Sequence, residues 1–401
     1  MATSGAKLFW GCEAIAVLPD ARANPNQLLM NDSTVGDFAR LRLEMVEAHR
    51  QRFGAGDDLM IGLQLTHSGR FSRPREKSRL EPAIVYHHPI LDSRFAPCAD
   101  CDPIPDSAIG SIVKAFAATA RLAAAAGFDF VDLKSCHGYL GHEFLSAYHR
   151  PGQYGGPLEN RTRFLRELIA AVRSSAPRLS IGVRLSVYDS IPFTIDPESG
   201  RGVPVAAAQG CGYTWGFGVD PEHPVQPELA EARQVLKMLR AHGVRLVNVT
   251  AGSPYYSAHL QRPALFPPCD SYPPPEDPLA GAARLQWAAR ELKAEVPGMI
   301  VVSSGWSYFQ DYLPHFAAAL VEAGWSDCIG LGRMMLSYPD LPADVLRGAP
   351  LDRRRLCRTF SDCTNGPRNG MVSGCYPLDP FYRDRPEGAA LRELKNEWAR
   401  V

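Results

Sequence analysis

The stretch VDLKSCHGYL, residues 131–140, decides the fold, and YGGPLENR at residues 154–161 continues it. Its first three residues are apolar or alternating, as in a buried β-strand, and Lys134, His137 and Tyr139 follow where that strand should end. Three side chains that can donate a proton or a hydrogen bond would then meet at one strand mouth. This grouping suits stabilisation of a developing oxyanion with proton delivery beside it. A chance cluster in a loop is the alternative for these three residues taken alone.

The composition indicates a soluble globular protein. Hydrophobic residues make up 45% of the 401 residues and charged residues 21%, which is typical of that class. Lys+Arg and Asp+Glu are both 43, so charge gives no indication of nucleic acid or an anionic membrane as partner. No apolar run is expected to be long enough for a membrane span. The apolar residues 8–17 contain Glu13 and lack a basic lead-in, which argues against a signal peptide.

The ten cysteines are scattered, so they do not form the framework of a small disulfide-rich domain. Cys12 and Cys328 fall in expected core strands, and Cys136 lies beside the proposed site. This usage predicts reduced thiols in a cytoplasmic protein. Cys98 and Cys101 form a single CxxC motif, but zinc would need two more ligands and none stands nearby, so we expect no metal there.

Strand-like and helix-like segments alternate along the chain. The expected strands are Leu8–Val17, Leu59–Leu65, Phe128–Leu133, Ser180–Leu185, Val244–Val249, Met299–Ser303 and Asp327–Leu331. The expected helices are Val35–Phe53, Ser107–Ala126, Glu159–Ser174, Gln226–His242 and Ala280–Glu295. Such alternation predicts parallel β/α units with right-handed crossovers.

Residues suited to chemistry recur after the ends of these strands, which is where a (β/α)8 TIM barrel places its active site. We therefore predict an α/β protein of that fold. A doubly wound sheet is the competing fold, but no G-x-G-x-x-G fingerprint follows an early strand. Only seven strands are recognisable where the barrel needs eight, so the barrel is expected to be incomplete at the N-terminus.

Two connections are long for a compact domain. Residues 188–224 and 253–278, after strands 5 and 6 of the expected barrel, are rich in Gly, Pro and aromatic residues. Such segments usually shape a pocket or a lid, although they could merely cover the barrel surface. No linker or internal repeat is evident. We expect a single domain over residues 1–401, with a C-terminal extension from about residue 350.

Two further strands carry polar residues at their mouths. Residues 63–70, LQLTHSGR, place Gln64 on a buried strand, where its amide needs a partner. Residues 182–186, GVRLS, place Arg184 on another, and a salt bridge inside the barrel would explain it equally well.

Together these segments resemble the Old Yellow Enzyme family of FMN-dependent ene-reductases, especially its branch of NADH:flavin oxidoreductases and 2,4-dienoyl-CoA reductases. The resemblance covers nearly the whole chain. It implies that Gln64 hydrogen-bonds the flavin pyrimidine ring and that the backbone of Ala14 lies near flavin N5. It also implies that Arg184 lies beside flavin N1 and O2.

Glycine-rich turns end the last two expected strands. Ser304 and Gly305 follow one of them, and Gly332 and Arg333 follow the next. Glycine lets backbone N–H groups approach a phosphate, and an arginine adds a charged fork. Because phosphate sites follow strands seven and eight of many barrels, these four residues predict a phosphate site. The resemblance makes that phosphate part of FMN.

Three features depart from the family pattern. Lys134 stands where the family has its first histidine, and it could instead pair structurally with a carboxylate. Some relatives bind an iron–sulfur cluster, but here Phe360 interrupts Cys357, Cys363 and Cys375, so we expect no cluster. The chain also begins close to the family's second strand, which leaves the first strand unaccounted for.

The resemblance therefore predicts an FMN-dependent oxidoreductase that uses NADH or NADPH to reduce the activated C=C bond of an α,β-unsaturated carbonyl. Lys134 and His137 would bind the carbonyl oxygen, and Tyr139 would protonate the α-carbon. The same flavin could serve a dehydrogenase or demethylase instead. Two alternatives belong to other functional classes. One is a non-catalytic or cofactor-free barrel, and the other is an enzyme that acts on a phosphosugar. We expect a small-molecule substrate and no nucleic-acid or membrane partner, with a homo-oligomer as one option.

Overall fold

The computed structural model describes all residues except 12, 96–99, 206–211 and 399–401. Its centre is one parallel sheet whose strands follow the order β1-β3-β4-β5-β8-β9-β10, with β2 also paired to β3. The strands of this sheet are β1 (Leu8–Phe9), β2 (Ala14–Ala16), β3 (Met60–Thr66), β4 (Phe130–Leu133), β5 (Ser180–Ser186), β8 (Leu246–Thr250), β9 (Ile300–Ser303) and β10 (Cys328–Ile329).

The strand order is that of a TIM barrel. From β3 to β10 each strand of this sheet pairs with the next strand of the sheet along the chain, and the order never reverses, as it would in a doubly wound sheet. All seven predicted strands are confirmed as strand positions. Among the described residues β10 pairs with neither β1 nor β2, so the sheet curls without closing, as expected for an incomplete barrel.

The first strand position is split, and here the single strand predicted over residues 8–17 was wrong. Leu8 pairs with Met60 and Ala14 with Gln64, so β1 and β2 run along the same edge of β3. Between them Gly11 has φ +101°, and a Cβ there would lie 3.1 Å from the backbone nitrogen of Gln64. Only glycine fits this conformation so close to the neighbouring strand.

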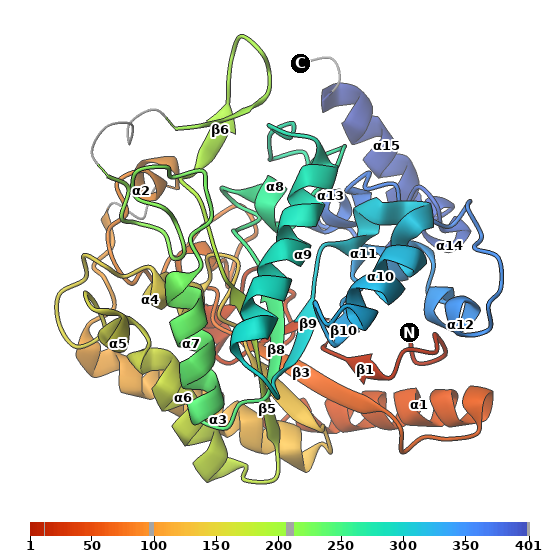
Figure 1. Ribbon diagram of the computed structural model, residues 1–401, viewed down its shortest axis with the longest axis horizontal. Helices are drawn as coiled ribbons and strands as arrows, with labels where there is room; N and C mark the ends of the chain where they lie inside the picture. The colour runs from red at the N-terminus through yellow and green to blue at the C-terminus, as the bar shows by residue number, and fades with distance from the viewer. Residues whose placement is uncertain (12, 96–99, 206–211, 399–401) are drawn as a thin grey trace.

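Helices cover the outer side of the curled sheet (Figure 1). Those of the barrel layer are α1 (Val35–Phe53), α3 (Asp106–Ala125), α5 (Leu158–Arg161), α6 (Arg163–Ser175), α7 (Ala230–Ala241), α9 (Pro278–Glu295) and α10 (Leu313–Glu322). Short helices in the connections are α2 (Leu91–Arg94), α4 (Leu140–Leu145), α8 (Ala258–Gln261), α11 (Arg333–Ser337) and α12 (Leu341–Leu346), and the C-terminal helices are α13 (Asp362–Arg368), α14 (Pro380–Arg383) and α15 (Pro386–Trp398). The predicted helices are confirmed, with α5 and α6 together taking the place of one.

Helix α3 shows how the outer layer is held. Its Ile109, Ile112, Val113 and Phe116 recur at three- and four-residue steps and are buried, and Phe116 meets Phe164 of α6 edge-on at 6.2 Å. By length and composition alone α3 could cross a membrane, contrary to the expectation that no apolar run would be long enough. A core helix of a soluble protein passes the same test, and α3 packs in that way.

The interior of the sheet is apolar at one end and polar at the other. Phe130 and Leu246, the first residues of β4 and β8, form a buried cluster with Val302 of β9, and Trp10 packs against it. Polar side chains gather at the opposite, carboxyl ends. The fold therefore has an apolar floor beneath a polar mouth, the arrangement in which TIM barrels carry their sites.

Both long connections carry structure. Residues 188–224 include the antiparallel pair β6 (Phe193–Ile195) and β7 (Gly202–Pro204), and residues 253–278 include α8. The C-terminal segment binds the second connection, and three of its hydrogen bonds go to the backbone there. Thr359 accepts one from the Leu265 N–H (3.1 Å), Ser361 donates one to the Phe266 carbonyl (2.6 Å), and Asn365 accepts one from the Cys269 N–H (2.9 Å).

Candidate active site

The residues after β4 form a tight turn at the mouth of the sheet. The backbone N–H of Lys134 donates to the Leu65 carbonyl at 3.2 Å, and that of Ser135 donates to the Arg184 carbonyl at 2.9 Å. His137 then has φ +67° and Gly138 φ +76°. A non-glycine residue in this conformation is strained, so the surroundings must hold the turn in place.

Lys134, His137 and Tyr139 come together as the sequence predicted. The Lys134 ammonium lies 4.0 Å from the centre of the Tyr139 ring. Among the described residues it has no ion pair within 4 Å, so the structure gives it no direct carboxylate partner. Glu13 lies within electrostatic reach and raises its pKa, but burial outweighs this effect and the pKa of Lys134 is lowered. Its roles in binding or catalysis stay predictions.

His137 is buried and neutral. Burial, followed by the nearby positive charges of Arg184 and Lys134, lowers its pKa well below the ordinary 6.5. Its Nε2 lies 3.5 Å from the Thr250 hydroxyl and 3.4 Å from Nε2 of Gln261. Both contacts are long for hydrogen bonds, so the ring retains capacity for a substrate atom.

Tyr139 has a partner that the sequence reasoning missed. Its hydroxyl lies 2.9 Å from the hydroxyl of Tyr255, and burial together with Tyr255 raises the pKa of Tyr139 well above 10. Phe71 stacks on Tyr255 with ring centres 4.0 Å apart. Tyr255 comes from the connection 253–278, whose aromatic content was the one signal that could have indicated it.

A buried carboxylate organises the next strands. Asp132 accepts hydrogen bonds from the Gln64 amide (2.5 Å), the Trp10 indole (2.8 Å) and the backbone N–H of Arg184 (2.5 Å). Burial raises the pKa of Asp132, and these hydrogen bonds oppose the rise. The amide of Gln64 is thus held by a protein partner, and Ala14 lies opposite it in the register of β2 with β3. Asp132, an acidic residue on an otherwise apolar strand, was not predicted as a site residue.

A salt bridge inside the barrel, the simple explanation for Arg184, is not found among the described residues. No ion pair within 4 Å joins Arg184 to a carboxylate among the described residues, and its Nε is buried without a hydrogen-bond partner. Its positive charge lowers the pKa of both Lys134 and His137. A buried guanidinium N–H without an acceptor costs free energy, so this position fits an acceptor supplied by a bound molecule.

The two glycine turns follow β9 and β10 as expected, and their role in binding a phosphate stays a prediction. The Ser304 hydroxyl donates to the Asn248 amide oxygen at 2.8 Å, and a Cβ on Gly332 would meet no atom within 4 Å. Gly305 has φ +92° and packs against Leu285. Open backbone at Gly332 leaves room for a phosphate group beside it.

Part of the Arg333 guanidinium group is bound within the protein. Its Nη2 donates to the Pro263 carbonyl at 2.9 Å, while Nη1 is buried without a hydrogen-bond partner. Burial, and then the neighbouring charge of Arg262, lower the pKa of Arg333 to about 10. Arg262 also lowers the pKa of His137, and Arg368 of α13 lies within electrostatic reach of Tyr139. The mouth is therefore rich in positive charge, and Arg262 and Arg368 were not predicted as part of it.

The cysteines of the C-terminal segment lie against this group. Cys357 and Cys375 are buried, and Arg262 Nη2 lies 3.9 Å from the sulfur of Cys363. Phe360 stacks on Phe266 with ring centres 5.3 Å apart. Among the described residues no group of three or more ligands could hold a metal ion. Absence of a cluster stays a prediction, and the CxxC motif lies partly outside the described residues because its first cysteine is residue 98.

The grouped polar residues lie at the carboxyl ends of parallel strands, which is where barrel enzymes carry their active sites. Residues 12–198 match the model of the NADH:flavin oxidoreductase / NADH oxidase family. This match agrees with the resemblance to the Old Yellow Enzyme family that the motifs at residues 63–70 and 131–140 carry.

Individual relatives agree. The chain is 36% identical over 172 residues to an NADPH dehydrogenase of Bacillus subtilis (strain 168), covering 40% of this chain and 44% of that protein. It is 29% identical over 247 residues to a probable flavin mononucleotide-dependent alkene reductase of Leishmania infantum, covering 61% and 51%. The matched regions thus span about half the length of these relatives.

The fold is shared with an old yellow enzyme homologue of Zymomonas mobilis, with a TM-score of 0.57 at 21% identity over 87% of this chain and 82% of that one.

Proposed function

We propose that this protein is an FMN-dependent ene-reductase that takes hydride from NADH or NADPH and reduces the C=C bond of an α,β-unsaturated carbonyl compound. The proposal rests mainly on the grouping of Lys134, His137 and Tyr139 at the mouth of the sheet. Beside them lies Arg184, whose buried Nε–H has no hydrogen-bond partner among the described residues. The names of the relatives, an NADPH dehydrogenase and a flavin mononucleotide-dependent alkene reductase, support the same reaction.

The residues fit FMN on two sides. Arg184 offers a buried donor without an acceptor, and Gln64 lies beside Ala14 on the adjacent strands. Gly332 offers open backbone for a phosphate, with Ser304 and Gly305 on the neighbouring turn and Arg333 able to donate through its free Nη1. Bound FMN would supply the hydride chemistry. Arg184 would place positive charge by its pyrimidine ring.

The remaining residues act on the substrate. Lys134, as a cation, and His137, as a neutral ring, would donate hydrogen bonds to the carbonyl oxygen, and these interactions strengthen as negative charge develops on that atom. Tyr139 would donate a proton to the α-carbon. Its raised pKa keeps the phenol protonated at neutral pH, which a proton donor requires.

The visible spectrum of the purified chain tests this function directly. We expect a flavin absorption band that survives gel filtration, or that appears with added FMN, and that bleaches anaerobically with NADPH or NADH. Addition of 2-cyclohexenone should restore it. A chain that shows no flavin band even with excess FMN would refute the proposal and favour a cofactor-free barrel. A band that bleaches but is not restored by the enone would instead favour a dehydrogenase or demethylase.

We also propose that residues 1–401 form one domain, since the C-terminal segment is hydrogen-bonded to the connection 253–278. We propose in addition that the protein is cytoplasmic and that it assembles into a homo-oligomer. Size-exclusion chromatography with light scattering tests the assembly.

A further inference from the structure

The strained turn at His137 and Gly138 is held by side chains behind the site. The N–H of Gly138 donates to Nδ1 of His142 at 2.9 Å, and the Ser253 hydroxyl donates to the His137 carbonyl at 2.9 Å. His142 lies in α4, directly after the turn, and is 1% exposed. Because the turn fixes where the His137 ring points, a residue that holds the turn controls the donor that is proposed to bind substrate.

The hydrogen bond from Gly138 determines where the ring proton of His142 lies. Burial lowers the pKa of His142 to about 3, so the ring is neutral near pH 7. A neutral imidazole that accepts at Nδ1 carries its proton on Nε2. This Nε2 is buried and has no hydrogen-bond partner among the described residues. The closest carboxylate oxygen is Oδ2 of Asp189 at 3.9 Å, too far for a direct hydrogen bond.

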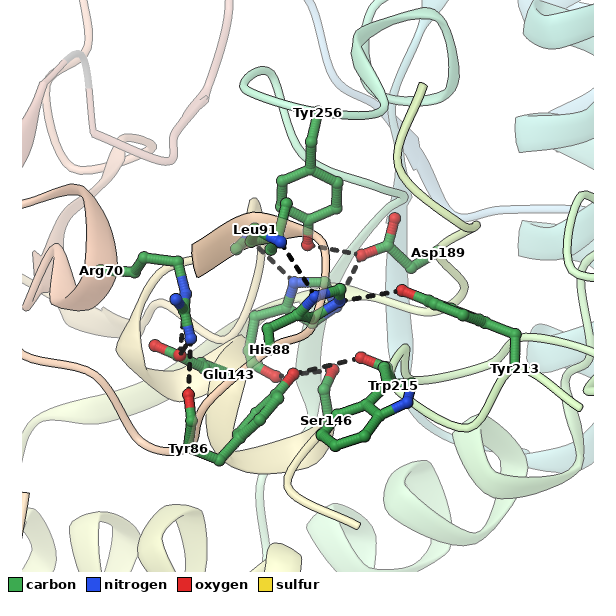
Figure 2. Close-up of a pocket in the computed structure, with 12 residues that line it drawn as sticks. Arg70, Tyr86, His88, Leu91, Glu143, Ser146, Asp189, Tyr213, Trp215 and Tyr256 are labelled. Carbon is green, nitrogen blue, oxygen red and sulfur yellow. Dashed lines mark hydrogen bonds and ion pairs between the residues drawn. The ribbon is translucent and has the colours of Figure 1, made fainter. Parts of the chain in front are cut away.

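Both residues line a small cavity. Figure 2 shows Asp189 and other residues around it. Its volume is about 10 Å³, close to the space that one water molecule needs. The polar residues that line it include His142, Asp189, Tyr213 and Ser146. A water there would accept from His142 and donate to Asp189, and so would have at least the two polar partners that buried waters require.

Asp189 is itself fixed and reaches the same turn by a second path. It accepts hydrogen bonds from the Tyr256 hydroxyl (2.7 Å) and the Ser257 hydroxyl (2.9 Å). The Ser257 hydroxyl also accepts the N–H of Ser253 at 2.8 Å, and Ser253 binds the His137 carbonyl. The carboxylate thus reaches the His137 carbonyl through Ser257 and Ser253, and it lies 3.9 Å from His142 Nε2.

We propose that this cavity binds one water molecule that bridges His142 Nε2 to Asp189, and that His142 is a positioning residue that keeps His137 aimed at the substrate. The water fixes the ring tautomer, and the tautomer presents Nδ1 to the N–H of Gly138. The catalytic part of this inference rests on the proposed ene-reductase function. The water and the tautomer do not.

Two substitutions separate the two ring nitrogens. In His142→Asn the side-chain oxygen occupies the position of Nδ1 and can still accept from Gly138. In His142→Gln the amide reaches toward the position of Nε2 and the acceptor for Gly138 is lost. His88→Gln is the matched control, because His88 is equally buried, lines the same cavity and makes no contact with the turn.

The first measurements need no activity. Nitrogen-15 NMR of histidine-labelled protein should show the neutral tautomer with the proton on Nε2 of His142, and a high-resolution crystal structure should show one water within hydrogen-bonding distance of Nε2 and Asp189. A proton on Nδ1, or a dry cavity, would overturn the inference even if the protein is an active ene-reductase.

The kinetic measurement uses the flavin-loaded enzyme. We expect His142→Gln to slow the enone-dependent step by roughly 10- to 100-fold, because small displacements of a reacting group cost that much. Flavin content and reduction by NADPH should not change. His142→Asn should recover most of the loss, and His88→Gln should keep the wild-type rate per flavin. Equal rates for the Gln and Asn variants would overturn the positioning role. If no variant or wild-type sample binds flavin, the proposed function fails while the tautomer and the water still decide the inference.

Discussion

Replacement of Lys134 by methionine tests the residue that most distinguishes this chain from the family that it resembles. Methionine keeps much of the side-chain length and removes the charge. Lys134 has no ion pair within 4 Å among the described residues, so the folded state loses no direct carboxylate contact. It does lose the contact with the Tyr139 ring, which is worth about 1 kcal/mol, and it gains because a partly buried cation is no longer desolvated. The net change in the free energy of unfolding should be within about 1 kcal/mol.

The expected kinetic effect is much larger. Removal of one preorganised donor to a developing oxyanion costs about 3 kcal/mol, or about 10²-fold in rate. Flavin content should stay the same, since the proposed flavin contacts are made by Arg184, Gln64 and the two glycine turns. Lys134→His, which restores the family's usual donor, should regain part of the rate.

The assay is anaerobic stopped-flow reoxidation of the reduced enzyme by 2-cyclohexenone, expressed per bound flavin, beside a melting curve. The pH profile adds a second readout. Because the pKa of Lys134 is lowered, the wild-type rate should fall on the alkaline side at a pH below the ordinary value of 10.5, and this limb should be absent from the variant. A lower melting temperature with an unchanged rate per flavin would refute the oxyanion role and assign Lys134 to stability.

Four other results are expected. Tyr139→Phe should slow reoxidation by enone about 10²-fold and leave reduction by NADPH unchanged, so equal reoxidation rates would assign the proton to another group. Arg184→Met should weaken FMN binding roughly 10- to 100-fold, as expected for one charge-assisted hydrogen bond, in a flavin fluorescence titration; unchanged affinity would contradict this contact. Burial raises the pKa of Asp189 to about 6 in the folded state, above the ordinary value of 3.8. The protonated carboxyl group therefore stabilises the folded state by about 3 kcal/mol below pH 3.8, and this stabilisation is lost as the pH rises through 6. Urea unfolding of wild type and Asp189→Asn should show their difference shifting in favour of the variant between pH 4 and 7, and a constant difference would exclude it. Gly305→Ala should cost about 1–3 kcal/mol of stability, because its φ is +92° and the new Cβ would lie 2.5 Å from Leu285, whereas normal unfolding would show that the turn can relax.

Sequence patterns predicted the helices and strands well where the spacing of apolar residues matches the side of the element that is buried. Helix α1 has the predicted bounds Val35–Phe53, because its pattern ends in Gly54, which closes the helix in the left-handed conformation. The split of residues 8–17 into β1 and β2 could not be predicted in the same way. It depends on how closely Gly11 approaches the neighbouring strand, and that is a property of the pairing rather than of local preference.

The sequence predicted the part of the site that comes from a single segment of the chain. Lys134, His137 and Tyr139 stand within six residues after one strand, so their convergence follows from local spacing. Tyr255 comes from a distant connection and meets Tyr139 only in the folded chain. Arg333 was placed on the right turn, but its direction depends on Arg262 and Pro263, which no sequence period reports.

The hydrogen bonds between the C-terminal segment and the connection 253–278 make two remote parts of the gene depend on each other. Thr359, Ser361 and Asn365 bind the backbone of residues 265–269, and the same connection carries Tyr255 to Tyr139. These three hydrogen bonds use the backbone of the connection, so they can survive changes of side chain at residues 265–269 while its path is kept. Insertions or deletions there would break the match with the tail. Substrate preference in this protein should therefore evolve by substitution within the connection rather than by change of its length.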